Sequence, residues 1–275
     1  QSALAGAERL VPLLEEEDRH IANEVPHEFK HIESIDFEHV WFSYDNNDVY
    51  ALEDFTLSIK AGEFIGIVGP SGSGKSTLLS LLMGLYNPTK GAIYINGIDI
   101  ANYDSSVLRH LMGYVFQQAY LFKGSIKDNL TLFDTSISYD DMVAAAKQVN
   151  LDSMIEQLPE GYHTPVGYLG SLLSDGQKQL LAFGRTLIRN TPILLLDEAT
   201  ANIDSHTEKQ IQASIENIRG SKTIVSIAHR LSTVQDANKI VYMEYGKIIE
   251  KGSFEELINS KGAFYNLWSN QQSGS

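Results

Sequence analysis

A glycine- and serine-rich loop of eight residues places the strongest constraint on how this chain can fold. It fits the pattern G-x-x-x-x-G-K-[ST] with Gly69, Pro70, Ser71, Gly72, Ser73, Gly74, Lys75 and Ser76. A continuous apolar run, residues 64–68, precedes it, and leucines at helical spacing follow at positions 78, 81, 82 and 85. Glycines let backbone N–H groups wrap around phosphate, and the N-terminus of the next helix adds a favourable potential. The loop therefore predicts a buried strand, a phosphate-binding turn and a helix in succession.

Side chains within this loop have distinct expected roles. Lys75 is expected to reach the β- and γ-phosphate oxygens of ATP, and the Ser76 hydroxyl to ligate Mg²⁺. The remaining phosphate contacts are assigned to the loop and the first turn of the helix, at Gly69, Ser71, Gly72, Ser73, Gly74 and Thr77. ATP and Mg²⁺ are thus the ligands that the sequence predicts.

Two adjacent acids end a second apolar run, residues 193–196. Because side chains alternate along a strand, Asp197 and Glu198 are expected to point in different directions. Such a pair on its own is more often a solvated edge or a helix cap. With a phosphate loop upstream, Asp197 is predicted to hold Mg²⁺ through water, and Glu198 to act as the general base that deprotonates the attacking water.

A histidine follows a third candidate strand, residues 223–228. A lone histidine at such a place is usually structural, but at a phosphate site His229 can donate a hydrogen bond to the γ-phosphate. Gln117, which follows a short apolar run, carries no functional meaning on its own.

The hydrophobic pattern predicts an α/β fold. Residues 35–44 and 52–59 alternate apolar and polar side chains, and residues 93–98 bracket an Asn96-Gly97 hairpin signal, so antiparallel strands are expected near the start. The continuous apolar runs instead suit strands buried on both faces of a parallel sheet. Helical spacing of Met142, Ala145, Ala146 and Val149 places an inserted helical part at about residues 125–187.

Composition excludes several classes of protein. With 21 Lys and Arg against 35 Asp and Glu, the formal net charge is −14, which repels nucleic acid and anionic membrane surfaces. The chain contains no cysteine, which excludes disulfides and thiolate metal sites. No apolar stretch approaches the roughly 18 residues that a membrane span needs. A globular domain with a sizeable core remains, since 43% of the residues are hydrophobic.

Together these motifs resemble the nucleotide-binding domains of ABC transporters. The family signature L-S-G-G-Q, which separates ABC proteins from other P-loop ATPases, is matched by Leu173, Ser174, Asp175, Gly176 and Gln177. The motifs keep the family's order and spacing over about residues 35–271. The resemblance implies a P-loop NTPase core with a parallel sheet, an N-terminal antiparallel β-subdomain and an inserted α-helical subdomain.

The resemblance also assigns roles to further residues. It implies that Tyr44 stacks on adenine, that Gln117 senses the γ-phosphate and ligates Mg²⁺ with Ser76 and Asp197, and that His229 is the switch histidine. Residues 201–204 would form the D-loop. Catalysis would then depend on Glu198, His229 and Lys75.

Family members work as head-to-tail dimers, in which one cassette's signature caps the ATP bound by the other. The resemblance therefore implies a second ABC cassette as partner, with Ser174, Gly176 and Gln177 contacting the partner's ATP. Ser174 opens a predicted helix whose N–H groups can face a phosphate, which is compatible with an ordinary N-cap role.

The exporter subtype depends on residues 164–170, which resemble the T-x-V-G-E-x-G stretch through which exporter cassettes touch their membrane helices. We therefore expect a transmembrane domain in the same polypeptide, and a location at the cytoplasmic face of a membrane as part of an integral membrane protein. Residues 1–32 are expected to be an extension after that membrane domain, residues 33–271 the ATPase domain, and residues 272–275 an added tail. The transported substrate leaves no trace in this sequence.

Two residues depart from the family pattern. Asp175 stands where the signature usually has glycine, and Tyr168 where exporters usually have glutamate. One hypothesis is that the chain is the catalytically intact half of a heterodimer, whose signature serves an impaired site. The alternative is a tolerated substitution in a homodimer.

Three other functions are alternatives to the ATP-driven exporter. A separately encoded ATPase subunit is one alternative. An ABC-type ATPase acting on nucleic acid is disfavoured by the charge of −14 and by the lack of a coiled-coil insertion between the phosphate loop and Asp197. A non-hydrolysing ATP clamp is disfavoured by Glu198 and His229, which such a clamp would not need.

Overall fold

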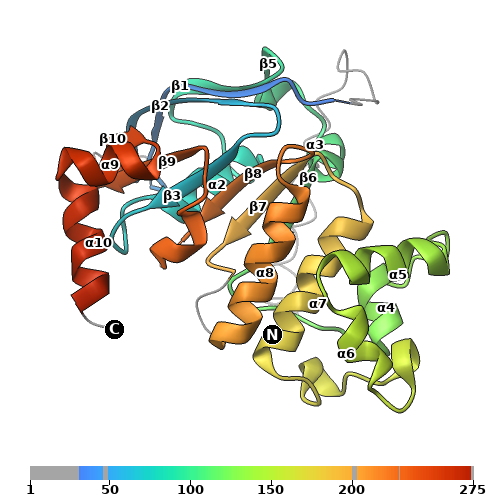
Figure 1. Ribbon diagram of the computed structural model, residues 1–275. Helices are drawn as coiled ribbons and strands as arrows, with labels where there is room; N and C mark the ends of the chain where they lie inside the picture. Colours follow the sequence, from blue (N-terminus) through green and yellow to red (C-terminus); the bar gives the residue numbers. More distant parts are fainter. Residues whose placement is uncertain (1–30, 46–48, 200–202, 229, 274–275) are drawn as a thin grey trace, which may run out of the picture.

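The computed structural model describes residues 31–45, 49–199, 203–228 and 230–273 of the 275-residue chain. Its described part contains two β-sheets, with helices packed around the larger one (Figure 1). The expected extension over residues 1–32 therefore lies almost wholly outside the described residues, as do His229 and the first two residues of the predicted D-loop, Ala201 and Asn202.

A four-stranded sheet in the order β2-β1-β4-β5 forms the N-terminal part. Its strands are β1 (Ser34–Phe42), β2 (Leu52–Lys60), β4 (Lys90–Ile95) and β5 (Ile98–Asp99). Every pair in it is antiparallel, as the alternating sequence predicted. Asn96 and Gly97 close the β4–β5 hairpin with φ of 54° and 75°, the left-handed conformation that a tight hairpin turn requires.

The central sheet has six strands in the order β10-β9-β3-β8-β7-β6. They are β3 (Phe64–Val68), β6 (Met112–Val115), β7 (Ile193–Asp197), β8 (Thr223–Ile227), β9 (Lys239–Glu244) and β10 (Lys247–Gly252). All neighbours pair in parallel except β9 and β10, which form an antiparallel hairpin at one edge. The three apolar runs were correctly predicted as buried strands, whereas β6, β9 and β10 were not anticipated.

Helices cover both faces of the central sheet. The α-helices are α2 (Lys75–Leu82), α3 (Ser105–Leu111), α4 (Ile126–Thr131), α5 (Tyr139–Gln148), α6 (Asp152–Glu156), α7 (Asp175–Ile188), α8 (Ser205–Ile218), α9 (Phe254–Ser260) and α10 (Ala263–Ser273). Short 3₁₀ turns are η1 (Ile100–Asn102), η2 (Gly161–His163), η3 (Tyr168–Gly170) and η4 (Leu231–Val234). In Figure 1, α4 to α7 lie together beside the central sheet, and α9 and α10 lie at its opposite edge. This arrangement confirms the predicted fold class.

One detail of the helix after the phosphate loop was wrong. Leu78, Leu81 and Leu82 are buried as expected, but Leu85 is 60% exposed. The helix ends at Leu82, and Gly84 turns the chain with φ of 69°. Leu85 therefore no longer belongs to the helical face.

The core consists of two hydrophobic clusters, one on each face of the central sheet. One includes Ile65, Leu195 and Val225 together with α2 and the antiparallel sheet. The other includes Leu194 and Leu196 and continues through α4, α5 and α7. Because neighbouring residues of β7 contribute to opposite clusters, the strand is buried on both faces and its carboxyl end is held firmly.

Candidate active site

The phosphate loop connects β3 to α2, as the sequence predicted. Two of its glycines are required by the surrounding backbone, because a Cβ on Gly69 would lie 2.1 Å from the Met243 carbonyl oxygen, and one on Gly74 would lie 2.4 Å from that of Ala51. Gly72 has φ of 77° and no neighbour within 4 Å of a Cβ built on it. Some glycines thus allow close chain packing, and Gly72 provides an open, left-handed position at the surface.

The exposed side of the loop is formed by Ser71, Gly72 and Ser76, whereas Ser73 and Thr77 are buried. Ser73 is only 2% exposed, so its side chain is buried. Ser76, the expected Mg²⁺ ligand, is exposed in the first turn of α2.

Lys75 lies inside the loop. Its Nζ donates hydrogen bonds to the carbonyl oxygens of Gly69 at 2.9 Å and Pro70 at 2.8 Å. Burial lowers the pKa of Lys75, and the nearby carboxylates of Glu198 and Asp197 oppose that effect. The lysine and both acids therefore interact electrostatically, although more than 100 residues separate them in the sequence.

Tyr44, the expected adenine contact, stands beside the start of α2. Its hydroxyl shares a hydrogen bond with Thr77 Oγ1 at 3.0 Å, while the residue is 54% exposed. The ring packs edge-to-face on Phe42 and Tyr86, with centroids 4.8 and 5.4 Å away. An exposed aromatic ring is thus held next to the phosphate loop, where a flat base could stack.

The two acids leave the sheet in different ways. Asp197 is the last residue of β7 and accepts a hydrogen bond on Oδ2 from the Tyr114 hydroxyl at 2.7 Å. Glu198 has left the strand with φ of 50°, a left-handed conformation that is costly for a residue with a side chain. Its backbone N–H donates to the Ile227 carbonyl at 3.1 Å.

Gln117 meets the predicted base directly, since its Nε2 donates to Glu198 Oε2 at 2.8 Å. The backbone beside it is held from the helical side, because Gln179 Nε2 donates to the Phe116 carbonyl at 2.8 Å. The Gln117 side chain thus bonds to the predicted base, and α7 holds the residue before it, a placement that the sequence context of Gln117 alone did not reveal.

The oxygen-bearing side chains around the loop suit Mg²⁺. Ser76, Gln117 and Asp197 offer a hydroxyl, an amide and one carboxylate. Within the described residues, no three His, Cys, Asp or Glu side chains gather into a metal-binding group. Mg²⁺ commonly binds through one or two carboxylates plus substrate phosphates, so this sparse donor set fits it.

The signature segment begins α7. The Ser174 hydroxyl accepts a hydrogen bond from the Gln177 N–H at 3.2 Å, and the Gln177 Oε1 accepts one from the Ser174 N–H at 2.9 Å. This capping box satisfies two donors at the start of the helix. Gly176 packs on α8, because a Cβ there would lie 2.5 Å from Thr207 Oγ1.

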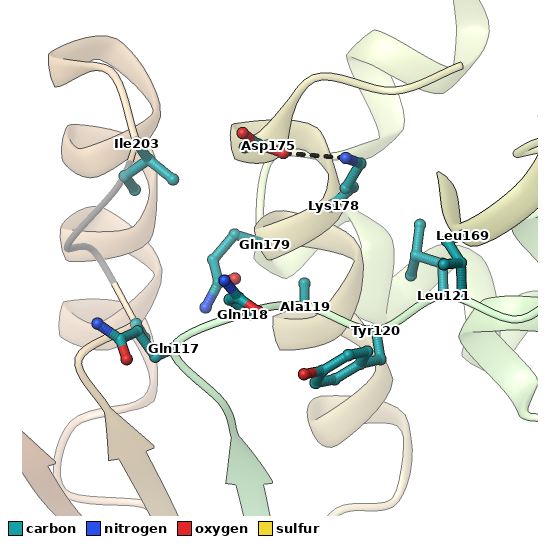
Figure 2. A pocket seen from close by; sticks show the side chains of 11 residues that line it. Gln117, Gln118, Ala119, Tyr120, Leu121, Leu169, Asp175, Lys178, Gln179 and Ile203 are labelled. Atoms are coloured by element: carbon teal, nitrogen blue, oxygen red, sulfur yellow. Dashed lines mark hydrogen bonds and ion pairs between the residues drawn. The ribbon is translucent and has the colours of Figure 1, made fainter. Parts of the chain in front are cut away.

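Asp175, the departure from the family signature, is in the first turn of α7 and forms an ion pair with Lys178 at 2.9 Å. Its side chain is 77% exposed. A cavity of about 240 Å³ lies alongside, lined by residues of the Gln117 segment and α7 and by Ile203. Figure 2 shows Gln118 and Gln179 between α7 and Ile203, with Asp175 and Lys178 above them.

Position 229 lies outside the described residues, but two residues that follow it contact one acid. Arg230 forms an ion pair with Glu208 of α8, and Ser232 Oγ donates to Glu208 Oε1 at 3.0 Å. Glu208 and Tyr114 were missed by the sequence analysis. The only sequence signal for Tyr114 was a hydroxyl within the otherwise apolar strand β6.

Comparison with known proteins agrees with this geometry. The family model for the ABC transporter matches residues 52–201, more than half of the chain. A putative ABC transporter ATP-binding protein, exp8 of Streptococcus pneumoniae, is 42% identical over 271 residues, which cover 98% of this chain and 46% of that protein. The β-(1→2)glucan export ATP-binding/permease protein NdvA of Bartonella bacilliformis is 41% identical over 234 residues, covering 85% of this chain and 39% of that protein.

A solved structure is also similar over nearly the whole chain. It is that of a bacterial Atm1-family ABC exporter with ATP bound, with a TM-score of 0.89 and 36% sequence identity, covering 98% of this chain and 47% of the other. The chain thus spans less than half the length of these relatives. The phosphate loop, the acids at the end of β7 and the signature at the start of α7 lie within a fold shared with these proteins, and the chain belongs to the ABC transporter family as an ATP-binding domain.

Proposed function

We propose that this domain hydrolyses ATP to drive an exporter, with Glu198 as general base. The observation that carries the proposal is the meeting of Lys75, Asp197 and Glu198 at the carboxyl end of the central sheet. A cation buried in a phosphate loop and two acids in electrostatic contact with it provide the groups that γ-phosphate transfer to water requires.

In the proposed reaction, Glu198 takes a proton from a water molecule whose oxygen attacks the γ-phosphorus of ATP. The bond from that phosphorus to the β–γ bridging oxygen breaks, and ADP and inorganic phosphate result. Lys75 stabilises negative charge on the β- and γ-phosphate oxygens. Mg²⁺, when bound by Ser76, Gln117 and Asp197, supplies further charge neutralisation. The remaining loop residues hold the phosphates in line through backbone N–H groups.

The hydrogen bond between Gln117 and Glu198 has a consequence for this reaction. The Gln117 amide holds one oxygen of the Glu198 carboxylate at 2.8 Å, and the carboxylate keeps further lone pairs that can accept a water proton. Movement of Gln117 would therefore change the orientation of the proposed base.

The signature segment is proposed to serve a second cassette in a head-to-tail dimer. The Ser174 hydroxyl accepts within its own capping box and keeps its proton, which it can donate to a γ-phosphate oxygen of the partner's ATP. Gly176 and Gln177 lie in the same first turn of α7, where the helix N-terminus favours an anion. His229 is proposed to contact the γ-phosphate within its own cassette.

Exposed apolar residues near Gln117 support the proposal that this side of the domain contacts a membrane domain. The members are Tyr120, Phe122, Phe133, Tyr168, Leu169 and Leu172, which are 54–78% exposed. The exporter-like residues 164–170 lie beside residues 121–126, because the Val166 N–H donates to the Gly124 carbonyl at 2.9 Å and Ser125 pairs with Pro165. A displacement of this surface can therefore be transmitted to Gln117 through the few residues that separate them in the chain.

The described residues include no helix with the length and apolar character of a membrane span. The named relatives include the export ATP-binding/permease protein NdvA, of which this chain matches a part. We propose that a transmembrane domain in the same polypeptide occupies the apolar surface and places this domain at the cytoplasmic face of a membrane. A separately encoded ATPase subunit is the alternative.

The domain boundaries fit the same proposal. Helices α4 to α7 agree with a helical subdomain over about residues 125–187, inside an ATPase domain of residues 33–271. Residues 272–275 are proposed to be an added tail.

Hydrolysis can be tested with the 275-residue chain by measuring Mg²⁺-dependent phosphate release over a wide range of protein concentration. The expected result is a rate per chain that rises with concentration and disappears in Glu198→Gln. Binding of ATP with no hydrolysis at any concentration would contradict self-sufficient catalysis. It would favour a heterodimer in which a different cassette completes the site.

A further inference from the structure

Tyr114 donates a hydrogen bond to the carboxylate that the proposed function assigns to the metal. Its hydroxyl lies 2.7 Å from Asp197 Oδ2. Strand β6 pairs in parallel with β7, and Tyr114 is opposite Leu195 in the register. Because side chains alternate along a strand, Leu195 and Asp197 share a face, and the phenol of Tyr114 extends along that face to reach Asp197.

The Tyr114 ring is held in place independently of this hydrogen bond. Its ring lies 4.4 Å from that of Phe116, measured between centroids, and it packs partly buried against the core cluster that contains α2. The Phe116 carbonyl in turn accepts from Gln179 at 2.8 Å. The hydroxyl therefore has a fixed position toward which the Asp197 carboxylate turns.

A phenol hydroxyl has one proton to donate, and Tyr114 donates it to one oxygen of the Asp197 carboxylate. Groups that orient a metal-binding carboxylate in this way commonly change metal affinity about 10- to 100-fold when removed.

We propose that Tyr114 is a positioning residue for magnesium. By holding Oδ2, it fixes the rotation of the Asp197 carboxylate and presents the group to the metal in one orientation. This proposal rests on the proposed function, in which Asp197 serves Mg²⁺. It goes beyond that function by adding a residue of β6 that no sequence motif marks.

A tyrosine–carboxylate pair is not functional in itself, and the chain offers matched examples. The Tyr162 hydroxyl donates to Asp152 Oδ1 at 2.6 Å in the helical part, and the Tyr242 hydroxyl donates to Glu244 Oε1 at 2.6 Å in β9. Neither of these carboxylates is among the predicted site residues. Tyr162→Phe therefore removes the same kind of hydrogen bond without touching the site.

The test uses a fluorescent ATP analogue, whose affinity for the 275-residue chain is measured in excess Mg²⁺ and in EDTA. The ratio of the two affinities reports the metal's contribution to binding without requiring hydrolysis. In Tyr114→Phe this ratio is expected to fall about tenfold, while the affinity in EDTA stays unchanged. In Tyr162→Phe both affinities are expected to match the unmodified chain. Thermal unfolding of both variants reports the stability that each lost hydrogen bond costs.

Three outcomes decide the question. A Tyr114→Phe ratio equal to that of the unmodified chain overturns the proposal, provided Asp197→Asn lowers the ratio. Equal losses in Mg²⁺ and in EDTA also overturn it, because they show a purely structural role. If Mg²⁺ has no effect on the unmodified chain, or Asp197→Asn leaves the ratio intact, the metal role of Asp197 is itself wrong, and the proposal for Tyr114 fails with it.

Discussion

The phosphate loop and the start of α7 both offer backbone N–H groups and hydroxyls, but they are built differently. The loop is supported by contacts within itself and with the sheet: Lys75 is held by two loop carbonyls, and the two acids at the carboxyl end of β7 interact with it. The start of α7 is supported by its own capping box and by packing of Gly176 on Thr207. Its first-turn residue Asp175 is largely exposed.

In the proposed head-to-tail dimer, this difference indicates which half of a shared ATP site a single cassette can prepare. The phosphate-loop half is organised within the chain, and its charged groups are already assembled. The α7 half has its local hydrogen bonds satisfied and can act only on a ligand brought from outside. Changes in the first half are therefore expected to act on chemistry and binding within one chain. Changes in the second half are expected to act through stability or association.

The largest effect is expected from Glu198→Gln. The amide cannot accept the water proton, so the rate of ATP hydrolysis should fall by about 10² to 10⁴. ATP binding should persist, because the phosphate loop is unchanged. Phosphate release and binding of a fluorescent ATP analogue measure the two quantities separately. Turnover close to that of the unmodified chain would refute the base assignment.

Lys75→Ala should weaken ATP binding itself by about 10- to 100-fold, since one charge-assisted interaction with phosphate is lost. Lys222 provides a matched control, because it is 9% exposed and its Nζ also donates to an amide and a carbonyl oxygen, at 3.0 and 2.7 Å. Lys222→Ala should lower stability and leave ATP affinity intact. Equal affinities in the two variants would remove the assigned role of Lys75.

Gly176→Ala should destabilise the fold by about 1–3 kcal/mol, because the added methyl group meets Thr207 at a distance that real contacts do not show. Gly184→Ala, in the same helix, would meet the ends of two flexible side chains, Leu130 at 3.1 Å and Val149 at 3.4 Å, and gains helix propensity. Urea unfolding of both variants compares them. Similar stabilities would mean that packing does not require glycine at position 176, and that contact with a ligand is the reason for it.

The smallest effect is expected from Asp175→Asn. The substitution removes one negative charge from the surface proposed to face the partner's phosphates and keeps a small polar side chain. ATP-dependent self-association, followed by light scattering, should strengthen severalfold as the repulsion is lost. Asp141→Asn, in the first turn of α5, is the control for a general charge effect. If both variants associate like the unmodified chain, Asp175 does not face phosphate.

The sequence predicted those parts of the fold and site whose signal is local. The phosphate loop, the hairpin at Asn96 and Gly97 and the N-cap at Ser174 each carry their geometry in a few adjacent residues. Strand β6 was missed because its four residues are too few to show a period. The β9–β10 hairpin was not recognised, although Tyr245 and Gly246 supply its left-handed turn.

The unpredicted contacts join residues far apart in sequence. Tyr114 and Asp197 are separated by 83 positions, and Gln117 and Glu198 by 81. Both pairs arise because β6 lies next to β7 in the sheet, a neighbour relation that no local pattern in the chain encodes. The left-handed backbone at Glu198 likewise could not be read from its residue type, because glutamate rarely adopts that conformation.

The hydrophobic cluster that runs from Leu194 and Leu196 of β7 through Leu181 and Phe183 of α7 to Met142 of α5 also bears on how the domain opens. A shared core makes local unfolding of α5 costly unless α7 detaches from the sheet as well. Amide protons in α5, α7 and β7 should thus exchange with deuterium as one cooperative unit, with a common opening free energy. The helices can move as a body, but this core ties their unfolding to that of the sheet.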